Sequence, residues 1–224
     1  MGFSKDLLNN NVSAKGQLEE SLYVSFFGDG GKKVLFVGNS ITRHRPLATI
    51  GWHGDWGMSA SSLEKDYVHL VADELKKRYG NVQCCIAGAA VWEQNYDDPE
   101  ILPKHYQNAR EFQADVVIVR IGENINRDKI KEIPLKKHFD QMISFFASNP
   151  KAKVFVSDLF WRSESIDDVI HEVVNENGYT FVEIGDLGED PAMKAIGLFE
   201  HRGVQLHPGD LGMRKIADRF LEKL

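Results

Sequence analysis

The sequence predicts an α/β protein, a three-layer α/β/α sandwich built around a mainly parallel sheet of five strands. Short apolar runs alternate along the chain with longer segments of helical period, which is typical of parallel strands connected by helices. Right-handed crossovers between such strands give an open sheet with helices on both faces. The runs expected to form strands are Lys33–Val37, Val82–Ile86, Asp115–Ile121, Lys153–Ser157 and Thr180–Ile184.

Helical periodicity fills the segments between these strands. The clearest case is Ser62–Tyr79, where apolar residues recur at spacings of three and four. Ser61 and Glu64 have the spacing of a capping box, which predicts that this helix begins next to Ser61. Pro134 suits the first turn of a later helix, and Gly178 suits the C-cap of the one after it. A last amphipathic segment closes the chain.

The chain has the length of one α/β domain, and no low-complexity linker or internal repeat divides its 224 residues. We therefore expect one domain over residues 31–224. Residues 1–30 form a lead-in to it, in which Leu22–Phe27 either adds an edge strand or simply enters the core.

Composition and charge exclude several classes of protein. The net charge is −6 and no basic run exceeds three residues, so no nucleic-acid partner is expected. No stretch has the length of a membrane span, and the polar N-terminus lacks the apolar core of a secretory signal. Cys84 and Cys85 are neighbours on an expected strand, where they point to opposite faces and remain free thiols. These features favour a cytoplasmic protein, unless an export signal was removed from the sequence.

Four residues that can carry chemistry follow the expected strands. In open parallel sheets, ligands bind beyond the carboxyl ends of the strands. Ser40 follows the first strand, Gly88 the second and Asn124 the third, and His207 precedes the last helix. Each also has an ordinary structural role, because a serine can cap a helix, glycine and asparagine form turns, and loop histidines usually lie on the surface.

Together these residues resemble the four sequence blocks of the SGNH (GDSL-like) hydrolase family. Ser40 stands in a Gly-Asn-Ser version of the family's Gly-Asp-Ser block, and Asn124 ends its Gly-x-Asn block; the resemblance covers residues from about 33 to 224. It implies the flavodoxin-like sandwich of that family and a carboxylic ester hydrolase. Ser40 would attack the ester carbonyl and His207 would accept its proton. The amides of Ser40 and Gly88 and the side chain of Asn124 would bind the oxyanion.

Two positions depart from the family's pattern. Asn39 replaces an aspartate that lies outside the proton path. Val204 replaces the aspartate that orients the histidine, and a valine side chain accepts no hydrogen bond. A backbone carbonyl such as that of Val204 could hold the ring, a carboxylate from Glu200 or Asp210 could substitute, or serine and histidine could act as a dyad. We favour the carbonyl; a protein that binds without turnover is the remaining alternative.

The tryptophans suggest a substrate. All four fall beyond strand carboxyl ends, and aromatic faces stack on sugar rings, so an ester of a carbohydrate is predicted; equally, they could wall a cleft or pack beneath loops. They are Trp52, Trp56, Trp92 and Trp161.

No metal or other cofactor is expected, because His44 and His53 have no Cys or carboxylate at a recognised ligand spacing and His69 lies within a predicted helix. The favoured hypothesis is a serine hydrolase that cleaves O-acetyl esters of a small molecule or an oligosaccharide. A thioesterase or lysophospholipase on the same fold, and a carbohydrate-binding homologue impaired in catalysis, are the alternatives. Acyl-chain preference separates the first two hypotheses, and the partner of His207 Nδ1 separates the third.

Overall fold

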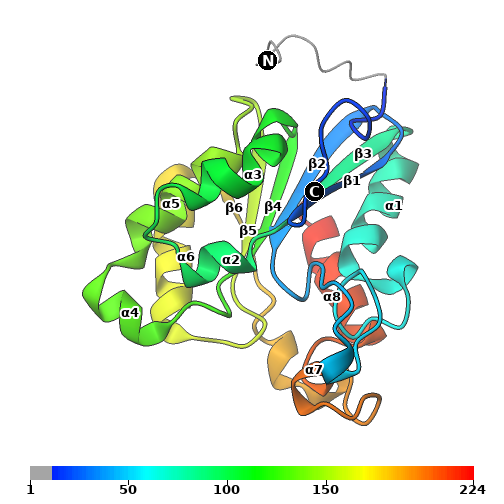
Figure 1. The fold of residues 1–224 in the computed structure, drawn as a ribbon, viewed down its shortest axis with the longest axis vertical. Helices are drawn as coiled ribbons and strands as arrows, with labels where there is room; N and C mark the ends of the chain where they lie inside the picture. Colours follow the sequence, from blue (N-terminus) through cyan, green and yellow to red (C-terminus); the bar gives the residue numbers. More distant parts are fainter. Residues whose placement is uncertain (1–11) are drawn as a thin grey trace.

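A computed structural model describes residues 12–224 and shows the predicted three-layer sandwich (Figure 1). Its sheet has six strands in the order β1-β3-β2-β4-β5-β6, and all neighbouring pairs except β1 with β3 are parallel. The five parallel strands agree with the predicted ones to within two residues at either end. The strands are β1 (Val24–Gly28), β2 (Lys32–Gly38), β3 (Val82–Gly88), β4 (Val116–Arg120), β5 (Lys153–Ser157) and β6 (Thr180–Val182).

Strand β1 settles the two readings of the segment Leu22–Phe27. It pairs antiparallel with β3, with Val24 opposite Ala87 and Gly28 opposite Gln83, so the segment is an edge strand and the sheet has one strand more than predicted. Residues 1–11 of the predicted lead-in lie outside the described residues.

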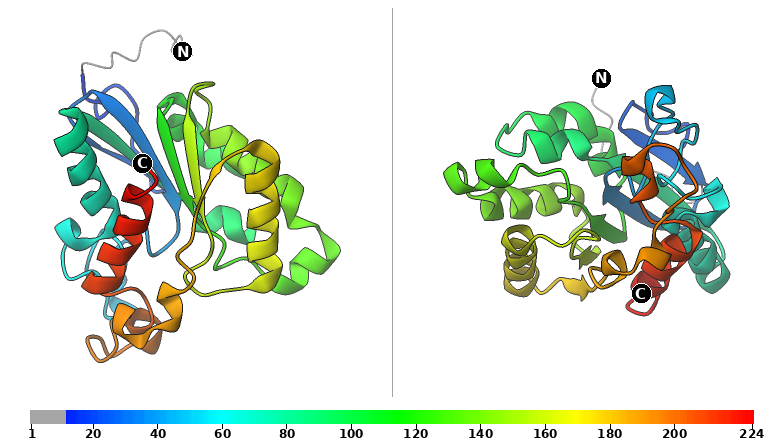
Figure 2. Two further views of the ribbon diagram at one scale, coloured as in Figure 1. Left: turned by 180° about the vertical axis from the view of Figure 1, so that it is seen from behind. Right: turned by 90° about the horizontal axis from the view of Figure 1, so that it is seen from below.

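Helices cover both faces of the sheet. The helices α1 (Tyr67–Tyr79) and α8 (Asp210–Leu221) pack together on one face (Figure 2). The other face is covered by α2 (Ala90–Gln94), α3 (Ile101–Glu111), α5 (Leu135–Phe146) and α6 (Glu164–Asn177). Two shorter helices, α4 (Arg127–Glu132) and α7 (Arg202–Gln205), lie in connecting segments, as do 3₁₀ turns at Ala48–Ile50, Leu63–Lys65, Leu187–Glu189 and Pro191–Met193.

The apolar alternation of each central strand divides the core into two halves. On β2, Val34 and Phe36 belong to the cluster beneath α1 and α8, and Leu35 and Val37 belong to the cluster on the other side. The two cysteines divide in the same way, as predicted: they are buried in opposite clusters and both are free. Burial on both faces explains why these strands read as continuous apolar runs.

The predicted start of the first long helix is wrong by several residues. Helix α1 begins at Tyr67, and its N-cap is Asp66, whose side chain accepts the backbone N–H of His69 at 2.8 Å. Ser61 forms no capping box, because its N–H and hydroxyl both donate to Asp210 at 2.8 Å. A carboxylate immediately before the helix is the better cap, and it leaves only a 3₁₀ turn ahead of it. Gly178 ends α6 in the left-handed conformation, as predicted.

Two long loops meet beyond the carboxyl ends of the parallel strands. They are residues 39–66, which connect β2 to α1, and residues 183–209, which connect β6 to α8; they lie at the lower end of the molecule in Figure 1. Among the described residues, no helix is both long enough and apolar enough to span a bilayer.

Candidate active site

Ser40 occupies a tight turn at the end of β2. A side chain at Gly38 would bring a Cβ to 1.8 Å from the Thr42 hydroxyl and 2.8 Å from the Arg120 carbonyl, so only glycine fits there. The chain then turns sharply, because the N–H groups of Thr42 and Arg43 both donate to the Asn39 carbonyl, at 2.9 and 3.0 Å. Ser40 is left half-buried at the mouth of the turn, beside the pocket described below.

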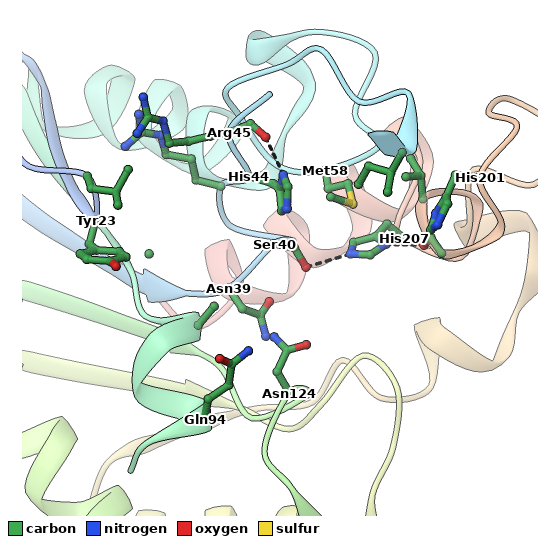
Figure 3. Close-up of a pocket in the computed structure, with 17 residues that line it drawn as sticks. Tyr23, Asn39, Ser40, His44, Arg45, Met58, Gln94, Asn124, His201 and His207 are labelled. Atoms are coloured by element: carbon green, nitrogen blue, oxygen red, sulfur yellow. Dashed lines mark hydrogen bonds between the residues drawn. The ribbon is translucent and has the colours of Figure 1, made fainter. Parts of the chain in front are cut away.

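His207 meets Ser40 across a sequence separation of 167 residues. The distance from Ser40 Oγ to His207 Nε2 is 2.8 Å, a hydrogen bond that Figure 3 shows at the centre of the site. His207 lies on the short segment between α7 and α8, and its backbone carbonyl accepts a hydrogen bond from the N–H of Ala195 at 3.0 Å. The two residues that the sequence placed beyond different elements therefore share one cleft.

The partner of the second imidazole nitrogen is the carbonyl of Gly203, at 2.7 Å from Nδ1. A carbonyl oxygen only accepts hydrogen bonds, so Nδ1 carries the proton in the neutral ring and Nε2 is the acceptor for the serine hydroxyl. In a continuing α-helix the backbone N–H of His207 would bond to the Gly203 carbonyl. Helix α7 ends at Gln205, and the N–H of His207 bonds to the Val204 carbonyl at 3.1 Å, so the Gly203 carbonyl stays available for the ring. A backbone carbonyl thus orients the histidine, one residue earlier than we expected.

The three other candidates for that role have different partners. The side chain of Val204 is buried against Trp52 and Met58, and its carbonyl accepts the Ser59 hydroxyl at 2.6 Å. Asp210 accepts from Ser61 and forms an ion pair with Lys65, with 2.8 Å between Nζ and Oδ2. Glu200 is exposed to solvent. No carboxylate therefore contacts the histidine in the part of the chain that the structure describes, because the helical turn of α7 presents a carbonyl instead.

His207 is held as a neutral base. Burial lowers the pKa of its imidazole to about 4, with a further lowering from the positive charge of Arg120, against the hydrogen bond to Gly203, which raises it. The ring also packs edge-on against Trp161, with 4.9 Å between ring centroids. At neutral pH, an unprotonated Nε2 is the form that can accept the serine proton.

Gly88 does not supply a free amide, which corrects one predicted oxyanion donor. Its N–H donates to the Tyr23 carbonyl at 2.8 Å, because edge strand β1 continues its pairing with β3 up to this point. The next amide, that of Ala89, donates to the Gly38 carbonyl at 2.6 Å. The Ser40 amide, in contrast, donates no hydrogen bond to any of residues 12–224.

Asn124 lies on the loop that follows β4 and lines the same pocket as Ser40 (Figure 3). The turn needs Gly122, whose φ is +140°, and it exposes the Asn124 side chain. That side chain donates from Nδ2 to Glu93 Oε2 at 2.6 Å. One of the two amide hydrogens is therefore engaged by the protein, and the other remains for a ligand.

A buried polar network lies beneath the site, and sequence reasoning missed most of it. Asn39 Nδ2 donates to Glu93 Oε1 at 3.0 Å and to Glu123 Oε2 at 2.7 Å, and Arg120 donates to both Asn39 and Glu123. Arg120 and Glu93 are each 0% exposed. An arginine ending an otherwise apolar strand, and a glutamate directly after a core tryptophan, are the sequence signals that could have indicated it, because charged groups are buried only with partners.

The two carboxylates of this network titrate in opposite directions. Burial raises the pKa of Glu93 to about 7, and the negative charge of Glu123 adds to the rise. Burial also acts to raise the pKa of Glu123, but the charge and hydrogen bonds of Arg120 bring it below its ordinary value. One cation facing two carboxylates explains the difference, since Arg120 bonds to Glu123 and not to Glu93.

The four tryptophans do not line the pocket, which removes the predicted stacking surface. Trp52 and Trp92 are 3% and 1% exposed and belong to hydrophobic clusters. Trp56 packs against Trp52, and Trp161 packs against His207. Their apolar area is used to hold loops and the histidine, which is the alternative that the sequence left open.

The pocket itself has a volume of about 520 Å³ and opens over Ser40. Its aromatic wall is Tyr23, from the segment just before β1, which Figure 3 shows among the lining residues. Arg45 and Gln94 add polar groups, and Arg43, which also lines the cavity, is paired with Asp55 through two hydrogen bonds of 2.8 Å. Among residues 12–224, no group of three His, Cys, Asp or Glu side chains is placed to hold a metal ion.

Comparisons with known proteins identify the fold. No family model matches the chain, and no curated protein is similar to it in sequence. Solved structures are similar to it: a two-domain esterase active on acetylated mannans, co-crystallized with mannopentaose, gives a TM-score of 0.52 at 16% identity over 86% of this chain and 50% of that one. A family two carbohydrate esterase from Cellvibrio japonicus gives 0.56 at 14% identity over 86% and 60%. A protein described as a GDSL-like lipase from Bacteroides ovatus gives 0.53 at 11% identity over 86% and 99%.

These similarities show that the chain has the SGNH (GDSL-like) hydrolase fold. The chain spans 50% and 60% of the lengths of the two carbohydrate esterases, so it corresponds to one part of each.

Proposed function

We propose that the protein is a serine hydrolase that cleaves carboxylic esters, with O-acetyl esters of a carbohydrate as its substrates. The observation that carries this proposal is the hydrogen-bonded series from Ser40 Oγ to His207 Nε2 and from His207 Nδ1 to the Gly203 carbonyl, at 2.8 and 2.7 Å. A nucleophile in contact with a base that is itself oriented is the arrangement that activates a hydroxyl group.

In the first step, Ser40 Oγ attacks the ester carbonyl carbon while His207 Nε2 takes the hydroxyl proton. The carbonyl oxygen becomes an oxyanion that accepts hydrogen bonds from the Ser40 amide and the Asn124 side chain. His207 then returns the proton to the departing alcohol, which leaves an acyl–serine. Water repeats the sequence to release the acid and regenerate the serine.

The Gly203 carbonyl supplies one of the two effects of the aspartate found in the family, the orientation of the histidine ring, but not the other, which is a negative charge. It fixes the orientation of the ring and favours the tautomer in which Nδ1 carries the proton, so that Nε2 is free to accept the serine proton. It supplies no full negative charge to the imidazolium. A negative charge does act on the ring from the carboxylate of Glu123, which raises the pKa of His207. This polar partner on Nδ1 argues against the alternative of a binding protein that has lost turnover.

Carbohydrate is the preferred alcohol for two reasons. Two of the structurally similar proteins are carbohydrate esterases, one of them active on acetylated mannans. The pocket combines an aromatic wall, Tyr23, with hydrogen-bonding side chains such as Gln94 and Asn124. Tyr23 therefore takes the stacking role first assigned to the tryptophans.

The decisive experiment is labelling with a serine-directed organophosphonate, followed by mass spectrometry and by kinetics on p-nitrophenyl acetate. We expect the label on Ser40, a burst of nitrophenol from acylation, and loss of both in Ser40→Ala. Labelling at another serine, or undiminished hydrolysis by Ser40→Ala, would remove Ser40 from its role. Preference for octanoyl over acetyl esters would favour the thioesterase or lysophospholipase alternative.

A further inference from the structure

Glu93 is a buried charge with no function in the mechanism above, although it touches the proposed oxyanion donor. It lies on the short helix α2, next to Trp92 in the core, and is 0% exposed. Four hydrogen-bond donors surround its carboxylate. Oε1 accepts from Gly122 N at 2.8 Å, Asn39 Nδ2 at 3.0 Å and Asn124 N at 3.1 Å, and Oε2 accepts from Asn124 Nδ2 at 2.6 Å.

Two of these four contacts hold the same residue. Glu93 takes both the backbone N–H and one side-chain N–H of Asn124, and a third contact fixes Gly122 in the same turn. Asn124 is otherwise an exposed side chain on a loop, free to change rotamer. With one amide hydrogen fixed to a buried carboxylate, the plane of the amide is set, and the other hydrogen has a defined direction.

From this geometry we propose that Glu93 is a positioning residue for ester hydrolysis, which holds Asn124 so that its free amide hydrogen binds the oxyanion. The inference rests on the proposed function, because it assigns Glu93 an effect through Asn124 and not through contact with the substrate. Donors that are already oriented before the reaction stabilise the transition state most, because no reorganisation is needed when the charge develops.

Every contact to Glu93 comes from a donor, so the ionised carboxylate is the form that fits. A glutamine here would place its own NH₂ group against one of these donors. Protonation has the same effect, since it adds a hydrogen to an oxygen that already faces N–H groups. The charged and titratable groups around Glu93 are Arg120 at the end of β4, Glu123 in the loop that follows it, and Tyr106 on α3. Burial first, then Glu123, raises the pKa of Glu93 to about 7, so protonation falls within an accessible pH range.

A double-mutant cycle on p-nitrophenyl acetate tests the proposal. Removal of one oxyanion donor typically lowers kcat about 10²–10³-fold, so we expect this of Asn124→Ala and a loss of about 10–10²-fold for Glu93→Gln with little change in KM. In the double variant, Glu93→Gln should add less than about threefold to the effect of Asn124→Ala, because it acts through a side chain that is no longer present. Glu132→Gln, on the exposed end of α4, is the matched control and should behave as the wild type.

Equal losses from Glu93→Gln in both backgrounds would show a general effect on the fold, and no loss in either would show that Asn124 needs no support. Each result overturns the proposal.

The pH profile of kcat/KM gives an independent readout: the acid limb should lie near pH 7 in the wild type, and in both single variants it should move toward the pKa of His207, about 4. An acid limb that stays in place would also overturn it.

One measurement needs neither activity nor a change at Glu93. The side-chain NH₂ resonances of Asn124 in wild-type protein should titrate with a midpoint near pH 7 in NMR spectra, and a flat response overturns the proposal. Failure of the proposed function looks different, since wild-type protein would then neither hydrolyse the ester nor take the label on Ser40.

Discussion

The asparagine at position 39 gives the sharpest test of the buried network. The SGNH hydrolase family that the sequence resembles often has aspartate there, so Asn39→Asp restores its Gly-Asp-Ser pattern, yet we expect the substitution to destabilise this protein. The side-chain NH₂ of Asn39 donates to Glu93 at 3.0 Å and to Glu123 at 2.7 Å. A carboxylate would replace that donor with an oxygen that faces two other carboxylates.

The size of the effect follows from the charges. At an effective dielectric of about 20, two like charges about 4 Å apart repel by about 4 kcal/mol. Glu93, whose pKa is about 7, is about half ionised at pH 7, so the two repulsions together come to about 6 kcal/mol, and one attraction of about 4 kcal/mol to Arg120, which already donates to Asn39, offsets part of them. The net cost is therefore about 2 kcal/mol, and at about 2–4 °C per kcal/mol in a chain of this length, the melting temperature should fall by about 4–8 °C at pH 7.

The loss should depend on pH in a defined direction. The carboxyl group introduced by Asn39→Asp would have a pKa in the folded variant above its unfolded value of about 4, because burial and the two glutamates disfavour its charge. Between those two values the folded state keeps a proton that the unfolded state has lost, so stability relative to the parent falls as the pH rises. Below about pH 4 the two proteins should differ least.

Thermal unfolding followed by circular dichroism at pH 4 and pH 7 measures both effects. The matched control is Asn126→Asp, the same chemical change at the exposed N-cap of α4, where aspartate caps as well as asparagine and the melting temperature should stay within about 2 °C. If Asn39→Asp behaves like this control at pH 7, the idea that Glu93 and Glu123 require an amide between them is wrong.

Two further predictions follow from the site. The pKa of His207 falls from 6.5 to about 4 on folding, so between these pH values the unfolded state binds a proton that the folded state does not. The free energy of unfolding of the wild type should therefore rise by about 3 kcal/mol from pH 4 to pH 6.5 relative to that of His207→Asn. Urea titrations measure this rise, and an equal dependence on pH in both proteins would contradict it. Gly38→Ala should destabilise the fold by about 3 kcal/mol because its Cβ would meet Thr42 at 1.8 Å, whereas Gly88→Ala, whose Cβ would meet only the Tyr23 carbonyl at 3.6 Å, should change stability by less than about 0.5 kcal/mol in the same assay.

Much of the fold could be predicted because it depends on local patterns. The five parallel strands are buried on both faces and therefore appear as unbroken apolar runs, which the sequence displays directly. The position of a residue relative to a strand end is also a local property. Since the carboxyl ends of parallel strands meet at one edge, Ser40 and Asn124 could be assigned to a common cleft, with His207 assigned to it by resemblance.

Hydrogen-bond partners and burial, in contrast, were decided by tertiary packing. Nothing local to Val204 shows that the turn of α7 offers the Gly203 carbonyl to His207, and nothing local to Gly88 shows that β1 takes its amide. The carboxylate of Glu93 lies 31 positions from Asn124 in sequence, and only the packing of α2 against the loop after β4 joins them. Periodicity encodes which face of an element is apolar, whereas the partner of a polar atom depends on how separate elements meet in three dimensions.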